Sequence, residues 1–140
     1  MKPKLIVGLA NPGEKYQATR HNAGAWFVES LAKKYQLALK LSPKFHGYIA
    51  RIQNEIIDCF VLIPSTFMNL SGQSVQAVAK FYNIAAQEML VAHDEIDLPT
   101  ASIRLKQGGG HGGHNGLRNI IDHLHDKQFF RLRIGVGHPG

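Results

Sequence analysis

The sequence has a single cysteine, Cys59, which excludes a fold held together by disulfide bonds. Cys59 lies in an apolar segment, so we expect a small buried side chain there, not a nucleophile. No apolar run approaches the ~20 residues that cross a membrane, and the first one stops at Asn11, too early for a signal peptide. We therefore expect a cytoplasmic protein with no membrane partner.

Several common catalytic motifs are also missing. No Gly-x-Ser-x-Gly sequence offers a serine nucleophile, and no cysteine pair offers a zinc site. The glycine run at 108–116 is not followed by the Lys-Ser/Thr of a P-loop, nor does it follow the first strand as a dinucleotide motif would. A hydrolytic site in this chain would therefore have to activate water directly.

The chain is short and basic. Its 140 residues are 44% hydrophobic and 19% charged, which is typical of one folded domain, and we expect residues 1–140 to form it. Sixteen Lys and Arg residues against ten Asp and Glu give a net charge of +6. Such a balance favours a polyanionic partner, nucleic acid or phosphate. The alternative is a basic surface that serves solubility alone.

Apolar periodicity predicts strands alternating with helices. We expect helices over 22–35, 71–82 and 113–125, with Ser71 as an N-cap. The expected strands cover 4–10, 47–52, 56–63, 89–93, 102–106 and 130–137, the second and third of them forming a hairpin. The pattern predicts an α/β fold: a single-domain three-layer sandwich with a twisted mixed β-sheet flanked by helices.

Polar residues follow strands or precede helices at five places: Asn11, His21, Asn69, Asp94 and Asn115. Ligands of α/β folds bind beyond the strand ends, so these side chains can converge on one crevice. Histidine is suited to take a proton near neutral pH, and a carboxylate can orient it. We therefore consider His21 a general base and Asp94 its partner. The alternative for His21 is a helix cap or a surface residue.

The three asparagines are candidate donors to a developing oxyanion. Fixed N–H groups aimed at that oxygen lower a hydrolytic barrier by about 2.7–4 kcal/mol each. The alternative is turn chemistry, which asparagine also favours, especially at Asn11 before Pro12 and Gly13.

The glycine run at 108–116 opens the third helix and can present N–H groups to a phosphate. A flexible loop without a ligand is the other interpretation. His111 and His114, with His93 and Asp94, are metal-ligand types, but their spacing on a glycine loop is not the helical HExxH spacing and no cysteine pair supports them, so we expect no metal.

Basic residues flank this glycine run. Strand alternation puts Arg104 and Lys106 on a common face of their strand, and it does the same for Arg131 and Arg133 on the last strand. Two such pairs can clamp a nucleic-acid backbone or a terminal phosphate. The alternative is ordinary solvated strand faces.

Five blocks, taken together and in order, resemble the bacterial peptidyl-tRNA hydrolase family. They are VGLANPG at 7–13, TRHNAG at 19–24, TFMNLSG at 66–72, HDEID at 93–97 and GGGHGGHNG at 108–116. The resemblance implies hydrolysis of the ester between a peptide and the 3′ ribose of tRNA, which recycles stalled peptidyl-tRNA without metal or cofactor. A monomer is expected.

The resemblance also implies roles for single residues. His21 matches the general base and Asp94 its supporting carboxylate, while Asn11 matches the residue that tells blocked from free aminoacyl-tRNA. Positions that hold the substrate's 3′ end, or line the same crevice, are matched by Tyr16, Phe67, Met68, Asn69, His114 and Asn115. Lys106 and Arg133 match basic positions that grip the 5′ phosphate region of the tRNA.

Family members continue beyond the position of Gly140, so the resemblance implies that a C-terminal segment is lacking and that apolar sheet surface is exposed. Two rival functions remain. One is a non-catalytic RNA-binding module on this fold, as in plant relatives. The other is a small-molecule hydrolase with an incidental basic surface.

Overall fold

The fold is described from a computed structural model that covers residues 2–11 and 22–137. Tyr16 and His21 lie outside the described residues. The helices are α1 (Ala23–Lys34), α2 (Ser71–Tyr82) and α3 (Asn115–Leu124), with short 3₁₀ turns η3 (Pro43–Phe45), η4 (Met68–Leu70) and η5 (Ala86–Glu88). The strands are β1 (Leu5–Gly8), β2 (Lys40–Ser42), β3 (Gly47–Gln53), β4 (Asp58–Pro64), β5 (Met89–Glu95), β6 (Ile103–Gln107) and β7 (Phe130–Gly135).

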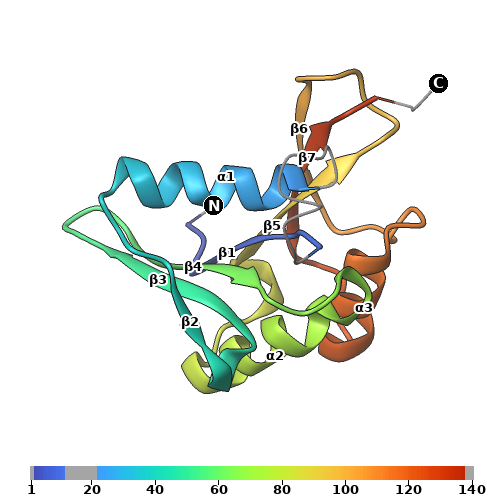
Figure 1. Cartoon of the computed structure of the whole chain (residues 1–140). Coiled ribbons are helices and arrows are strands. Elements are labelled where there is room, and N and C mark those ends of the chain that lie inside the picture. The colour runs from blue at the N-terminus through green and yellow to red at the C-terminus, as the bar shows by residue number, and fades with distance from the viewer. Residues whose placement is uncertain (1, 12–21, 138–140) are drawn as a thin grey trace.

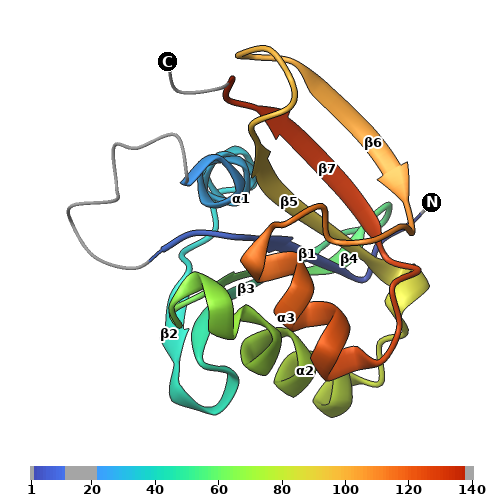
Figure 2. The same ribbon diagram turned by 90° about the vertical axis from the view of Figure 1, so that its right-hand side faces the viewer.

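Within the described residues the strands form one seven-stranded sheet in the order β2-β3-β4-β1-β5-β7-β6. The four central strands β4, β1, β5 and β7 run parallel, and the pairs at both edges are antiparallel. Helix α1 covers one face of the sheet, and α2 and α3 lie side by side on the other (Figures 1 and 2). The expected three-layer α/β sandwich with a mixed sheet is confirmed.

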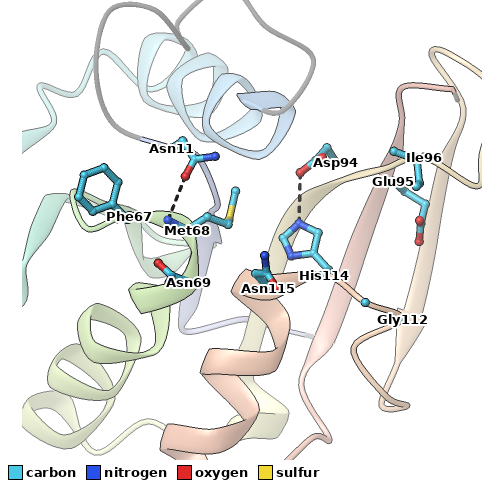
Figure 3. A pocket seen from close by; sticks show the side chains of 11 residues that line it. Asn11, Phe67, Met68, Asn69, Asp94, Glu95, Ile96, Gly112, His114 and Asn115 are labelled. Carbon is cyan, nitrogen blue, oxygen red and sulfur yellow. Dashed lines mark hydrogen bonds and ion pairs between the residues drawn. The ribbon is translucent and has the colours of Figure 1, made fainter. Parts of the chain in front are cut away.

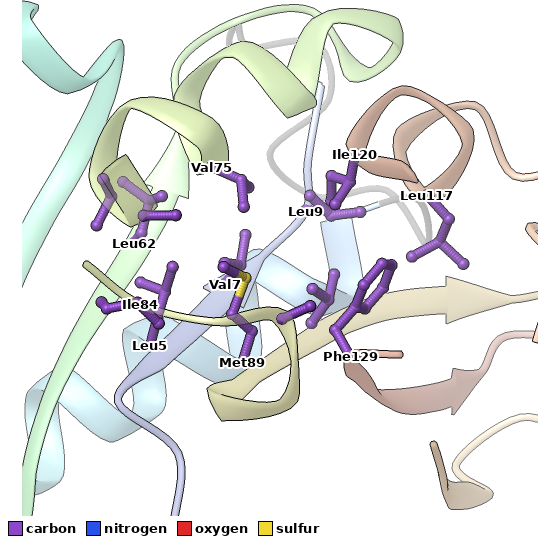
Figure 4. Close-up of a cluster of buried hydrophobic side chains, with 14 of the residues drawn as sticks. Leu5, Val7, Leu9, Leu62, Val75, Ile84, Met89, Leu117, Ile120 and Phe129 are labelled. Carbon is purple, nitrogen blue, oxygen red and sulfur yellow. The ribbon is translucent and has the colours of Figure 1, made fainter. Parts of the chain in front are cut away.

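Side-chain alternation along β1 serves both layers. Leu5 and Val7 are fully buried and pack with Val75 of α2 and Ile120 of α3 (Figure 4). Ile6 points to the opposite face, into a cluster with Val28 of α1. Cys59 belongs to this second cluster with 1% of its surface exposed, and burial raises the pKa of its thiol to about 12. The predicted buried cysteine is confirmed.

Two glycines bring the start of α1 against the sheet. A Cβ on Gly8 would collide with the carbonyl oxygen of Gly24, and one on Gly24 would collide with that of Ala92. The first turn of α1 therefore lies directly on the carboxyl ends of β1 and β5. This close approach sets Asn22, the residue before the helix, beside Asn11, whose backbone N–H donates to Asn22 Oδ1 at 3.3 Å.

The predicted elements are all present, but some boundaries were wrong. Helix α3 begins at Asn115 and not at 113, because Gly112 and Gly113 have positive φ angles that no right-handed helix contains. Ser71 is the first residue of α2 and not its cap, and its hydroxyl donates back to Met68 O. The predicted hairpin is confirmed as β3 and β4. Strand β2 was not predicted.

Among the described residues, no helix combines the length and the apolar character that crossing a membrane requires. On the edge strand β6, Ile103 and Leu105 keep 55% and 59% of their surface exposed, so part of the sheet face on the α1 side is uncovered.

Candidate functional site

A cavity of about 630 Å³ opens where β1 and β5 end, between η4 and the start of α3 (Figure 3). We call it the central cavity. Its polar lining comes from Asn11 after β1, Asn69 in η4, Asp94 in β5, and His114 and Asn115 at α3. These segments are far apart in sequence, and the parallel strands bring their ends to one edge, as the fold predicts.

Asn11 ties the first strand to η4. Its Oδ1 accepts from the backbone N–H of Met68 at 3.1 Å (Figure 3). The side-chain oxygen is thus engaged, and Nδ2 is left as a donor for a carbonyl group in the cavity. A second hydrogen bond joins the two helices that follow the cavity walls: the Gly72 N–H at the start of α2 donates to Asn119 Oδ1 of α3 at 2.7 Å.

His114 caps α3. Its Nδ1 accepts from the backbone N–H groups of Gly116 at 3.1 Å and Leu117 at 3.3 Å. Since Nδ1 is an acceptor, the proton of the neutral ring is on Nε2. Nε2 then donates to Asp94 Oδ1 at 3.2 Å, and Asp94 is 8% exposed. The helix N-terminus therefore fixes the tautomer of His114, and His114 in turn fixes the carboxylate.

His93 lies behind this pair and outside the central cavity. Its ring stands edge-on to that of His114, with 4.9 Å between centroids, and it is 2% exposed. Nδ1 bonds to the backbone oxygen of Asp94 at 2.8 Å, while Nε2 finds no partner among the described residues. Burial, together with the neighbouring His114, lowers the pKa of His93 to about 4, so the ring is neutral near pH 7.

Arg131 orders the glycine loop. Its guanidinium donates to the carbonyl oxygens of Gly110 and, at 2.7 Å, Gly109, and also to that of Lys127 at 3.0 Å. The side chain is 2% exposed and packs over the ring of Phe129, and burial lowers the pKa of its guanidinium. The alternative that Arg131 lies on an ordinary solvated strand face is therefore wrong. Arg131 supports the loop that carries His114 and Asn115.

A second hollow of about 260 Å³, the basic hollow, shares Glu95 and Gly112 with the central cavity. Lys106, Arg131 and Arg133 line it. Arg133 Nε donates to Glu95 Oε1 at 3.1 Å, so its charge is partly balanced. The side chain of Lys106 on the edge strand lies against Gly109 and is exposed. The two predicted phosphate contacts thus lie together beside the cavity.

The structure gathers most of the predicted site. The central cavity contains Asn11, Phe67, Met68, Asn69, Asp94, His114 and Asn115, and the basic hollow contains Lys106 and Arg133. His21 and Tyr16 lie outside the described residues, although His21 directly precedes Asn22 in the chain.

Sequence reasoning missed Glu95 and Ile96, which also line the central cavity. They directly follow Asp94 in the HDEID block, and that proximity was the available signal.

The described residues hold no group of three or more His, Cys, Asp or Glu side chains placed to bind a metal ion. His111 and His114, considered above as ligand types, instead use Nδ1 to accept backbone N–H groups, that of Gly113 at 3.0 Å for His111. Both histidines therefore stabilise the glycine loop.

Comparison with known proteins identifies the family. The peptidyl-tRNA hydrolase family model matches residues 5–140. A peptidyl-tRNA hydrolase of Sodalis glossinidius is 61% identical over all of this chain and 73% of its own length, and one of Acinetobacter baylyi is 60% identical over 99% of this chain and 72% of its own.

The crystal structure of peptidyl-tRNA hydrolase from Acinetobacter baumannii superposes with a TM-score of 0.94 at 59% identity, over 99% of this chain and 70% of that one. These comparisons give no support to the non-catalytic RNA-binding module. The matched blocks, the shared fold and the cavity that unites their polar residues lead to one conclusion: the chain belongs to the peptidyl-tRNA hydrolase family.

Proposed function

We propose that this chain hydrolyses the ester bond between a peptide and the 3′ ribose of tRNA. The main support for the proposal is that amide donors, a histidine and a buried carboxylate line one cavity, and that this cavity lies next to a basic hollow. Family membership at about 60% identity supports the same reaction. The basic hollow suits the polynucleotide, and the central cavity suits the ester.

His21 is the proposed general base. It takes a proton from water, whose oxygen then bonds to the acyl carbon of the ester. The tetrahedral oxyanion collapses by breaking the bond to the ribose 3′ oxygen, which receives the proton from His21. The products are a free peptide carboxylate and a tRNA with a 3′ hydroxyl group.

Asp94 is the carboxylate that stabilises the imidazolium formed on His21. Its orientation is fixed by His114, whose own tautomer is set by the amides of α3. Asn69 and Asn115 supply amide N–H donors to the oxyanion, and each such donor is worth about 2.7–4 kcal/mol of barrier. Phe67 and Met68 provide apolar wall for the 3′-terminal nucleoside, together with Tyr16.

Asn11 selects peptidyl-tRNA over free aminoacyl-tRNA. Its Oδ1 is occupied by Met68 N–H, so Nδ2 can donate to the peptide carbonyl that follows the esterified residue. An unblocked aminoacyl group has no such carbonyl and places an ammonium group there. That group cannot accept a hydrogen bond, so the Asn11 donor has no partner on such a substrate, which lowers the rate.

Lys106 and Arg133 contact phosphates near the 5′ end of the tRNA, and we propose that the chain acts in the cytoplasm as a monomer. Sedimentation of the free protein across a concentration series tests this, and a concentration-dependent dimer would refute it.

The decisive variant is His21→Ala. It should remove most of kcat on N-acetyl-aminoacyl-tRNA while tRNA binding, measured by filter retention, persists. Near-normal turnover in this variant would rule out His21 as the base. A small-molecule hydrolase with an incidental basic surface would instead cleave short esters at a rate independent of salt.

A further inference from the structure

A third hollow, of about 650 Å³, lies on the other side of Asn11. We call it the aromatic groove. It runs between α1 and the strand pair β3 and β4, and Asn11 lines both this groove and the central cavity. The basic hollow, the central cavity and the aromatic groove are therefore neighbours in that order, and each shares lining residues with the next.

Two aromatic side chains dominate the groove. Trp26 of α1 and Tyr48 of β3 line it, each with 42% of its surface exposed. Tyr48 is paired across the strands with Ile63 of β4, and Leu39 extends the apolar wall. An aromatic surface of this kind favours contact with apolar side chains or with nucleobases.

The charged residues of the groove indicate which of these two occupants, apolar side chains or nucleobases, fits better. Among its described lining residues the one charged side chain is the carboxylate of Glu29, and there is no lysine or arginine. The basic hollow at the far end carries the exposed Lys106 and the partly exposed Arg133, besides the buried Arg131 and the carboxylates of Glu95 and Asp97. A nucleic-acid backbone gains most of its affinity from Lys and Arg contacts, so it is attracted to the basic hollow and not to the aromatic groove.

We propose that the aromatic groove binds the side chains of the peptide in peptidyl-tRNA, beyond the residue esterified to the ribose. This inference rests on the proposed function. With the ester in the central cavity and the polynucleotide leaving over the basic hollow, the acyl chain leaves on the side of Asn11. Its first peptide carbonyl meets Asn11 Nδ2, and the following apolar side chains then lie against Trp26 and Tyr48.

The test compares two substrates on the same tRNA. One carries N-acetyl-phenylalanine, and the other carries an N-acetylated tripeptide with two leucines before that phenylalanine. In the wild-type protein kcat/KM should be about tenfold higher for the tripeptide, because buried apolar groups add selectivity of that order. Trp26→Ala and Tyr48→Ala should each remove most of this ratio, mainly through KM, and Trp26→Phe should restore it.

Phe81→Ala is the matched control, because Phe81 is an aromatic side chain of α2, on the opposite layer, with 56% of its surface exposed. It should leave the ratio at the wild-type value. A ratio that does not change in either groove variant would overturn the inference while leaving the proposed function intact. Hydrolysis of neither substrate by the wild-type protein would refute both.

Glu29→Lys distinguishes peptide from RNA as the occupant. If the groove binds apolar side chains, this variant should leave the salt dependence of KM for N-acetyl-phenylalanyl-tRNA as it is in the wild type. If the groove binds RNA, the added cation should steepen that dependence by about one unit of slope. The steeper slope would overturn the inference.

Discussion

The basic hollow and the aromatic groove border the same central cavity, yet different interactions hold their walls in place: polar contacts in the hollow and apolar packing in the groove. The hollow is ordered by polar contacts, with Arg131 binding loop carbonyls and Arg133 paired with Glu95. The groove is ordered by packing, with its wall residue Ile63 partly buried against the cluster that contains Val28 of α1. On the proposed function, the charged RNA part of the substrate lies at the basic hollow, and the apolar peptide part lies at the aromatic groove on the other side of the central cavity.

The largest effect is expected from a substitution in the central cavity, which lies between the basic hollow and the aromatic groove. Asp94→Asn should lower kcat by about 10⁴-fold, since a carboxylate that orients a catalytic histidine has an effect of that size. The loss should be equal for short and long peptides. The measurement is steady-state turnover with both acyl groups.

Asp58→Asn is the control for this substitution, because Asp58 is an exposed carboxylate paired with Arg51 on β3 and β4. It should retain wild-type turnover. Near-normal activity in Asp94→Asn would show that the chemistry does not take place in the central cavity.

His93, which lines the basic hollow, should make the stability of the protein depend on pH. The pKa of buried His93 is lowered to about 4, whereas an unfolded histidine titrates near 6.5. Between these values the unfolded chain alone takes up the proton. The free energy of unfolding should therefore fall by up to about 3 kcal/mol as the pH drops from about 6.5 to about 4, and no further below that.

Urea unfolding across this pH range checks the prediction. His93→Gln has no titrating group at this position and should lose that part of the slope. Identical pH profiles for the two proteins would mean that His93 is protonated in the folded state.

A smaller effect is expected at the edge of the basic hollow. Lys106→Ala removes one exposed cation, so the salt dependence of tRNA binding should flatten by about one unit of slope. Lys80→Ala removes an exposed lysine of α2, and its slope should stay that of the wild type. An unchanged slope in Lys106→Ala would exclude Lys106 from the RNA contact.

The smallest effect is expected at the ion pair between Glu95 and Arg133 in the basic hollow. Glu95→Gln frees Arg133 from its carboxylate partner, 3.1 Å away. Because a partly exposed ion pair is worth about 0.2–1 kcal/mol, tRNA affinity should rise by about threefold. Titration at low salt measures it, and weaker binding would show that Glu95 instead holds Arg133 in its binding position.

Periodicity predicted the regular elements well where burial decides them. Helix α2 matches its predicted range because Val75, Val78 and Ala79 form a single buried stripe. Strand β2 was missed because it has three residues and its Leu41 is 56% exposed, so it has no alternation to detect. The start of α3 depends on positive φ angles in the glycine run, which composition permits but does not locate.

The strand-end rule brought Asn11, Asn69, Asp94 and Asn115 together correctly, because parallel strands have their carboxyl ends at one edge. The bond between Asp94 and His114 was not predictable. It depends on two backbone amides that occupy Nδ1 of His114, and this is a detail of helix capping. Strand alternation likewise predicted which face of the sheet Arg131 lies on. It did not predict that the side chain is buried, because the burial depends on the glycine loop that covers it.

The most direct measurement of the central claim is the release of N-acetyl-phenylalanine from tRNA by the wild-type protein, at low and at high salt, beside unblocked phenylalanyl-tRNA. We expect rapid hydrolysis of the blocked ester, a KM that rises with salt, and little hydrolysis of the unblocked one. Equal hydrolysis of both esters, or a rate that ignores salt, would contradict the central claim.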